Sequence, residues 1–175
     1  MLKKTILVVG GAGYVGSVII DQLLKKNYNV ICVDKLIYKN KNSIKNFKKN
    51  FKFYKLDAIS LKLKKIISKS DFIVYLAGLV GDPITKKYPK TSLINNEHTI
   101  KKFIKFCVQG KKKNTFIFVS TCSNYGLRDK NEKAKENSKL NPLSLYAKSK
   151  VKIEKYLLSI KKSTFDPVII RFSTA

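Results

Sequence analysis

A glycine-rich turn near the amino terminus constrains the fold of this chain more than any other feature. Residues 10–16 (GGAGYVG) follow a short apolar run at 5–9 (TILVV) and precede a segment with helical periodicity. Gly10 permits a tight turn, Gly13 lets the backbone approach a ligand, and Gly16 allows close packing of helix on strand. A helix that begins there points free N–H groups outward, which suits a pyrophosphate. In this strand–turn–helix context the glycines predict a dinucleotide-binding fold rather than a plain turn.

Short apolar runs and helix-type segments alternate along the rest of the chain. The predicted strands are Thr5–Val9, Asn29–Val33, Phe51–Lys55, Phe72–Leu76, Thr115–Ser120 and Pro167–Arg171. The predicted helices are Tyr14–Lys26, Ser43–Lys49, Leu61–Ser68, Ser92–Gln109 and Leu143–Lys161. Continuously hydrophobic runs are typical of parallel strands covered on both faces. We therefore predict an α/β fold, a doubly wound parallel (Rossmann) sheet of about six strands in the order 3-2-1-4-5-6.

Length and composition narrow the class of protein. A chain of 175 residues is expected to form one domain, residues 1–175, and contains no apolar run long enough to span a bilayer. The three cysteines show neither paired nor metal-ligand spacing and His98 is the single histidine, so we expect no metal site. The odd cysteine count suits a reducing compartment, and glycines at once break the apolar start, so we expect a cytoplasmic protein with no membrane partner.

The formal net charge of +26 raises the alternative of a nucleic-acid binder. Base reading and bidentate phosphate contacts favour arginine. Only Arg128 and Arg171 among the 37 basic residues are arginine. The lysines are spread along the whole chain, which is typical of a solvated surface. We therefore expect no nucleic-acid partner; such a binder would show an affinity that falls steeply with salt and survives loss of Gly13.

Two acidic positions follow predicted strands. Asp34 ends the second strand, 18 residues after Gly16, where a carboxylate can accept hydrogen bonds from the adenosine ribose hydroxyls. It would repel the 2′-phosphate of NADP, so we expect NAD, although Lys35 weakens that preference slightly. Asp57 and Ala58 close the third strand, where an acidic side chain could bind the adenine amino group or simply lie in a loop.

A hydroxyl, a phenol and an ammonium form the predicted catalytic set. Tyr146 and Lys150 lie four residues apart on one helical face, a pair that also arises by chance in a lysine-rich chain. Their position favours function, because Tyr146 follows Thr121 by 25 residues and Thr121 lies just past the fifth predicted strand. A tyrosine must lower its pKa from about 10 to about 7 to act as a base, and an ammonium about 4 Å away supplies most of that change. Thr121 would then orient a substrate hydroxyl.

These motifs together resemble the NAD-dependent epimerase/dehydratase family, the extended short-chain dehydrogenase/reductases. The resemblance extends from the glycine turn through residues 76–83 (LAGLVGDP), Ile94-Asn95 and residues 141–150 (NPLSLYAKSK) to residues 171–174 (RFST). Tyr75 departs from the family's common histidine, and Gly78 from its common alanine. Cys122 and Ser123 stand where sugar 4,6-dehydratases usually carry an acidic pair, which favours epimerase or oxidoreductase chemistry over dehydration.

The resemblance implies an NAD-dependent enzyme that oxidises a sugar hydroxyl of a UDP-, dTDP-, GDP- or CDP-linked substrate. Tyr146, Lys150 and Thr121 would be catalytic, and no metal would take part. The implied cofactor-binding residues are Gly10, Gly13, Tyr14, Val15, Gly16, Asp34, Asp57, Ala58, Leu76, Ala77, Gly78, Asn95, Ser120, Tyr146, Lys150 and Phe172. Family members continue into a smaller substrate lobe, so we expect a truncated N-terminal portion, with a non-catalytic NAD-binding module or inactive fragment as the alternative. A homodimer through helices 92–109 and 143–161 is a further expectation by analogy.

Overall fold

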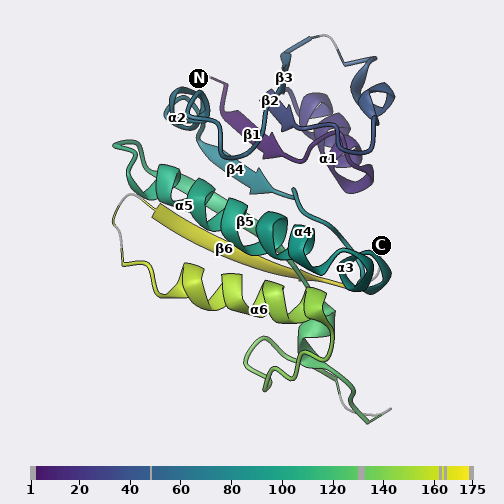
Figure 1. Ribbon diagram of the computed structural model, residues 1–175. Helices are drawn as coiled ribbons and strands as arrows, with labels where there is room; N and C mark the ends of the chain where they lie inside the picture. Colours follow the sequence, from purple (N-terminus) through teal and green to yellow (C-terminus); the bar gives the residue numbers. More distant parts are fainter. Residues whose placement is uncertain (1–2, 48, 130–132, 162, 164, 174–175) are drawn as a thin grey trace.

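A six-stranded parallel sheet forms the centre of the computed structural model, which describes residues 3–47, 49–129, 133–161, 163 and 165–173. The strand order is β3-β2-β1-β4-β5-β6, which confirms the predicted doubly wound topology (Figure 1). The strands are β1 (Thr5–Val9), β2 (Asn29–Asp34), β3 (Phe51–Lys55), β4 (Phe72–Tyr75), β5 (Asn114–Thr121) and β6 (Phe165–Phe172). The predicted strands differ from these by at most two residues at either end, which is within the usual uncertainty of element boundaries.

The connections between strands carry the helices. The α-helices are α1 (Tyr14–Lys25), α2 (Leu63–Ile67), α3 (Asp82–Lys87), α4 (Pro89–Leu93), α5 (Ile100–Val108) and α6 (Leu145–Leu158). Shorter elements are the 3-10 turns η1 (Lys41–Ile44) and η3 (Cys122–Tyr125) and the π-helix η2 (Ile94–Thr99). Among the described residues, no helix has the length and apolar character needed to cross a bilayer.

Two helix predictions need correction, and one helix was not predicted. The predicted helix at 43–49 is only the 3-10 turn η1, and Lys48 lies outside the described residues. The predicted helix at 92–109 begins earlier, at Pro89, and passes through the π-helical turn η2 before α5. Helix α3 was not predicted, because its six residues are too few to show a hydrophobic period; proline near its first turn was the only local signal.

Alternating side chains of the central strands divide the core into two clusters. On β1, Ile6 and Val8 pack on the α1 side together with Ile20, whereas Leu7 and Val9 pack on the opposite side. The second side is the larger and contains the aromatic group Tyr75, Phe103, Phe116, Phe118 and Phe165. Because both faces of β1 and β4 are covered, these strands need no polar alternation, which explains why their sequences are continuous apolar runs.

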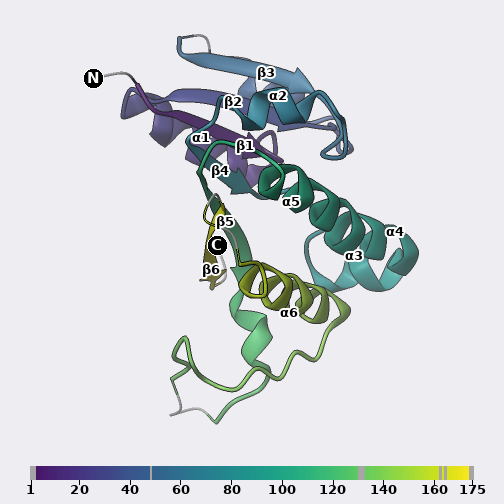
Figure 2. The same cartoon turned by 90° about the vertical axis from the view of Figure 1, so that its left-hand side faces the viewer.

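One half of the sheet is covered on a single face. Figure 2 shows α5 and α6 on one side of β5 and β6, and no described helix lies over the other side. The outward side chains of β6 are correspondingly part-exposed, at 40–41% for Val168, Ile170 and Phe172. This apolar strip adjoins the carboxyl ends of the strands, so it borders the site described next.

Candidate functional site

A cleft of about 860 Å³ lies at the carboxyl ends of the strands. Its lining includes every residue predicted from the sequence as a cofactor or catalytic contact, from Gly10 and Asp34 on one side to Thr121, Tyr146 and Lys150 on the other. Open α/β sheets bind their ligands at this edge. The fold therefore brings segments 10–16, 33–40, 56–58, 75–83 and 119–123 together with Tyr146 and Lys150 around one space.

The glycine turn is fixed by its backbone. Gly10 has φ +82°, and a Cβ there would lie 2.5 Å from the Ala77 nitrogen, so only glycine fits. A Cβ on Gly16 would lie 2.6 Å from Gly11 Cα. The prediction was that Gly16 allows the helix to pack closely on a strand, but the close approach is to the glycine turn itself. Gly13 is the N-cap of α1, and no side chain caps that helix. The first N–H groups of α1 therefore face the cleft without a side-chain acceptor, which suits an anionic group.

Two carboxylates stand at the ends of β2 and β3. Asp34 accepts hydrogen bonds from the backbone nitrogens of Ala12 (3.0 Å) and Leu36 (2.7 Å), which lock its position beside the glycine turn. Asp57 accepts a hydrogen bond from the Lys35 ammonium at 2.8 Å. Burial opposes ionisation of Asp57, but Lys35 and neighbouring backbone N–H groups outweigh it and hold the pKa of Asp57 below its usual value.

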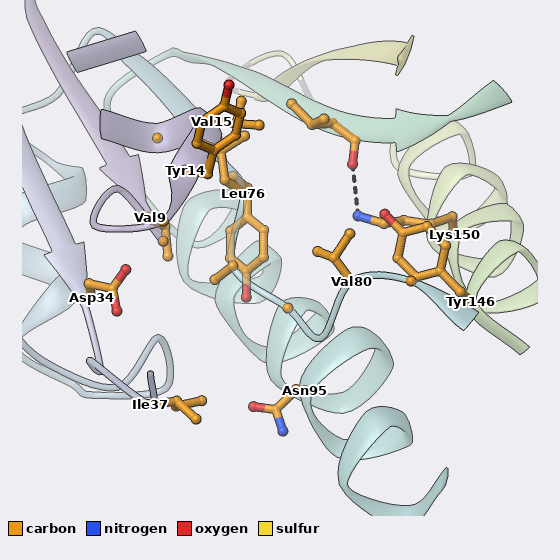
Figure 3. Close-up of a pocket in the computed structure, with 18 of the residues that line it drawn as sticks. Val9, Tyr14, Val15, Asp34, Ile37, Leu76, Val80, Asn95, Tyr146 and Lys150 are labelled. Atoms are coloured by element: carbon orange, nitrogen blue, oxygen red, sulfur yellow. Dashed lines mark hydrogen bonds between the residues drawn. The ribbon is translucent and has the colours of Figure 1, made fainter. Parts of the chain in front are cut away.

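The predicted catalytic side chains come from β5 and α6. Thr121 caps η3 by accepting a hydrogen bond from the Ser123 nitrogen, and Ser144 caps α6 by accepting one from the Ala147 nitrogen. Lys150 donates to the Val119 carbonyl at 2.8 Å, and its Nζ lies 5.5 Å from the centre of the Tyr146 ring. Figure 3 shows the Tyr146 ring and the Lys150 side chain together on one side of the cleft, across from Asp34. The phenol and the ammonium are thus neighbours, as predicted.

The protonation of this pair differs from the prediction. Burial raises the pKa of Tyr146, and the nearby Asp82 carboxylate raises it further. Burial also lowers the pKa of Lys150 to about 8, although Glu154 opposes this change. The prediction was that the Lys150 ammonium, with a further contribution from the nicotinamide ring, lowers the Tyr146 pKa. Among the protein's own groups, burial and Asp82 instead raise it.

Replacing Lys150 by methionine should alter how stability depends on pH. Because folding lowers the Lys150 pKa from 10.5 to about 8, the unfolded chain binds more protons between these values, and stability rises with pH there. The wild-type free energy of unfolding should gain up to about 3 kcal/mol between pH 8 and 10.5 relative to Lys150→Met. Urea denaturation of both proteins at several pH values measures the difference, in which the other lysines cancel. Parallel stability curves would contradict the assigned burial.

A buried carboxylate next to the predicted catalytic residues was not predicted. Glu154 is 1% exposed and accepts hydrogen bonds from Ser120 (2.5 Å), Asn124 (2.7 Å) and the Arg171 guanidinium (2.7 Å). Ser120 was predicted as a cofactor-binding residue; its hydroxyl donates to Glu154 instead. The sequence signal was the glutamate four residues after Lys150, on the same helical face.

Arg171 extends this network outward. It donates to the Tyr125 hydroxyl (2.8 Å) and to the Glu136 carbonyl (2.9 Å). Residues 126–141 contain no helix or strand in their described part, and Arg171 connects Glu136 of that loop to β6. The network consequently joins β6, η3, α6 and the loop around one ion pair.

A second residue missed from the sequence holds the loop after β4. Asn96 is buried in η2 and pairs with both backbone groups of Leu79, at 2.8 Å each. A Cβ on Gly78 would lie 2.7 Å from the Asn96 oxygen, which explains why glycine is tolerated and alanine would be crowded at this position. The predicted Asn95 lines the cleft but donates its own amide to the Thr91 carbonyl. π-helical turns frequently occur at functional sites. Here the π-helical turn η2 contains both Asn95, which lines the cleft, and Asn96, which holds the loop after β4.

Comparison with protein families gives a match over residues 6–175 to the NAD dependent epimerase/dehydratase family. An uncharacterised UDP-glucose epimerase, YtcB, of Bacillus subtilis is 34% identical, over 97% of this chain and 56% of the relative. A dTDP-D-glucose 4,6-dehydratase of Dictyostelium discoideum is also 34% identical, over 95% of this chain and 42% of the relative. The chain thus spans about half the length of the curated relatives it matches.

Solved structures agree with this assignment. The UDP-N-acetylglucosamine 4-epimerase of Methanobrevibacter ruminantium superposes with a TM-score of 0.83 at 31% identity, over 98% of this chain and 55% of the other. The UDP-glucuronic acid 4-epimerase of Bacillus cereus, solved with UDP-glucuronic acid and NAD, gives 0.86 at 27% identity, over 95% and 55%. With the family match covering nearly all of the sequence, this chain belongs to the NAD-dependent epimerase/dehydratase family.

Proposed function

We propose that residues 1–175 are the NAD-binding domain of a nucleotide-sugar epimerase or oxidoreductase. The observation that carries the proposal is the shared cleft: the uncapped N-terminus of α1 and the Tyr146–Lys150 pair face the same space. The names of the similar proteins support it, since several are epimerases named for UDP-sugars, and the UDP-glucuronic acid 4-epimerase was solved with NAD.

The residues of the cleft fit NAD in size and chemistry. A volume of about 860 Å³ lies in the range of cofactor-sized sites. The α1 N–H groups would hold the pyrophosphate, Asp34 the adenosine ribose, and Lys150 the nicotinamide ribose. Two buried oxygens of residues that line the cleft, Asn40 Oδ1 and the Tyr75 hydroxyl, have no hydrogen-bond partner among the described residues. A polar ligand that reached them would relieve the cost of leaving them unpaired.

The reaction we propose is reversible oxidation of a sugar hydroxyl. Tyr146 accepts the hydroxyl proton, and Thr121 donates or accepts a hydrogen bond at the same oxygen to orient it. NAD, when bound, supplies the two-electron oxidation and a positively charged ring that favours the tyrosinate. Lys150, protonated at neutral pH, also stabilises that anion, so that cofactor and lysine together must overcome the burial that raises the Tyr146 pKa.

Epimerisation or simple oxidation fits the site better than dehydration. Thr121 is followed by Cys122 and Ser123, and the Ser123 hydroxyl and N–H both contact the Thr121 hydroxyl at 3.2 Å. No carboxylate follows Thr121 there to remove a second proton from the sugar.

The homodimer through the helices predicted at 92–109 and 143–161 stays a prediction.

Tyrosine 146 provides the catalytic test. In the 175-residue chain supplied with NAD and UDP-glucose or dTDP-glucose, Tyr146→Phe should lower turnover at least about 100-fold, because the proton acceptor is lost. NAD affinity should change less than about threefold, since the ring and Lys150 remain. Turnover is followed by the absorbance of reduced nicotinamide and by chromatography of the sugar nucleotides.

The outcomes separate two functions. Turnover by Tyr146→Phe within a few fold of wild type would contradict the proposed base. NAD binding without turnover by the wild-type chain would favour the alternative, a non-catalytic NAD-binding module.

A further inference from the structure

We propose that Asp57 determines the choice between NAD and NADP by neutralising Lys35, so that Asp34 alone sets the charge at the adenosine ribose. The inference rests on the proposed NAD site and names the residue that makes it specific. Lys35 would otherwise be well placed to attract a 2′-phosphate.

The three side chains meet because β2 and β3 are adjacent parallel strands. Asp34 pairs with Lys55 in the strand register, and the Leu56 nitrogen donates to the Asp34 carbonyl at 3.2 Å. Lys35 is the first residue after β2 and Asp57 the second after β3, and both line the cleft together with Asp34. Their ion pair, 2.8 Å between Lys35 Nζ and Asp57 Oδ2, therefore crosses from one strand end to the other.

Asp34 cannot turn away from the ribose position. Its two oxygens are held by the Ala12 and Leu36 nitrogens, and Leu36 adopts a left-handed backbone with φ +59° that keeps the turn tight. Asn40 and Ser43 donate to the Ala12 carbonyl, which ties the following loop to the glycine turn. The negative charge at this point is consequently fixed, whereas Lys35 has a flexible stem.

The sign of the site follows from adding these charges. Lys35 and Asp57 cancel, so the fixed Asp34 leaves one net negative charge, which repels a 2′-phosphate bearing about two negative charges. Removing the Asp57 charge leaves Lys35 free and makes the group of three neutral. The side chains of Lys35 and Asp57 are 58% and 34% exposed, so solvent screens the pair and moderate effects are expected.

Nucleotides that differ only in the 2′-phosphate provide the sharpest probe. We would measure dissociation constants of 5′-AMP, 2′,5′-ADP, NAD and NADP for the 175-residue chain by calorimetry at low ionic strength. Wild type should prefer 5′-AMP and NAD. Asp57→Asn should shift both preferences toward the 2′-phosphorylated member by about tenfold. Adding Lys35→Gln to Asp57→Asn should cancel that shift.

Matched variants keep the result interpretable. Asp71→Asn removes a second lysine-paired carboxylate, 3.0 Å from Lys112, but at the start of β4 rather than at the cleft, and should leave the preference unchanged. Lys35→Gln alone alters an exposed side chain and should strengthen the preference for NAD. The folding of each variant is checked by urea denaturation.

An unchanged ratio of NADP to NAD affinity in Asp57→Asn would overturn the inference, as would wild-type binding of NADP equal to that of NAD. A shift in Asp57→Asn that persists without Lys35 would also overturn it, because the lysine would then play no part. If wild type binds neither nucleotide, the proposed function itself fails, which is a distinguishable result.

Discussion

Replacing Glu154 by alanine should lower the free energy of unfolding by roughly 3–5 kcal/mol. The carboxylate is buried and accepts hydrogen bonds from Ser120, Asn124 and Arg171. Its removal leaves the buried Lys150 ammonium without its counter-charge and Arg171 without its main partner. Breaking one side of a buried ion pair costs much more than the pair contributes as a whole, because the remaining charge stays desolvated.

Two further variants test whether burial is the cause. Glu154→Gln keeps an acceptor for Ser120 or Asn124 and should lose less stability than alanine. Asp21→Ala breaks the surface pair with Lys25, 2.7 Å long with side chains 66% and 40% exposed, and should change stability by less than about 0.5 kcal/mol. Urea midpoints provide the comparison. A loss below about 1 kcal/mol in Glu154→Ala would show that the network is dispensable.

The glycine turn provides the second large effect. Gly10→Ala should destabilise the protein by roughly 2–4 kcal/mol, because alanine is strained at φ +82° and its Cβ would lie 2.5 Å from the Ala77 backbone. Gly13→Ala should change stability by less than about 1 kcal/mol, since φ is −70° and the nearest atom to the new Cβ is the Gly10 oxygen at 3.3 Å.

The same pair of variants separates folding from binding. The Cβ of Gly13→Ala would occupy space beside the first N–H groups of α1, where the pyrophosphate is proposed to bind. We therefore expect NAD affinity to fall at least about tenfold in a protein that remains folded. NAD titration and urea denaturation of both variants give the two readouts. Equal stability losses at the two positions, or unaltered NAD binding in Gly13→Ala, would contradict the distinct roles assigned to these glycines.

The sequence predicts the sheet well because its strands are buried on both faces and interrupted by clear turn signals. β1 and β3 agree residue for residue with the prediction, and the strand order is confirmed. The failures fall where no period can develop: the six-residue α3, the 3-10 turn η1, and the π-helical turn η2 inside a longer helix.

The site divides in a similar way. Glycine spacing, a strand-end carboxylate and a tyrosine–lysine pair follow local rules, so Gly10, Asp34 and Tyr146 could be identified from the sequence, and all three line the cleft. Contacts between residues that are far apart in the sequence could not be predicted in this way. Glu154 and Arg171 lie 17 residues apart and meet only because α6 packs beside β6. The burial that raises the Tyr146 pKa could not be predicted for the same reason, since it depends on tertiary packing.

The guanidinium of Arg171 has a mechanical consequence. This one planar group donates hydrogen bonds to the Glu154 carboxylate, the Tyr125 hydroxyl and the Glu136 carbonyl, which belong to three separate segments. The Glu154 carboxylate also accepts a hydrogen bond from Ser120, the residue directly before Thr121. Glu136 in the loop after η3 is thus connected through Arg171 and Glu154 to Ser120, so we expect a substitution of Arg171 to disturb the position of Thr121 as well as that loop.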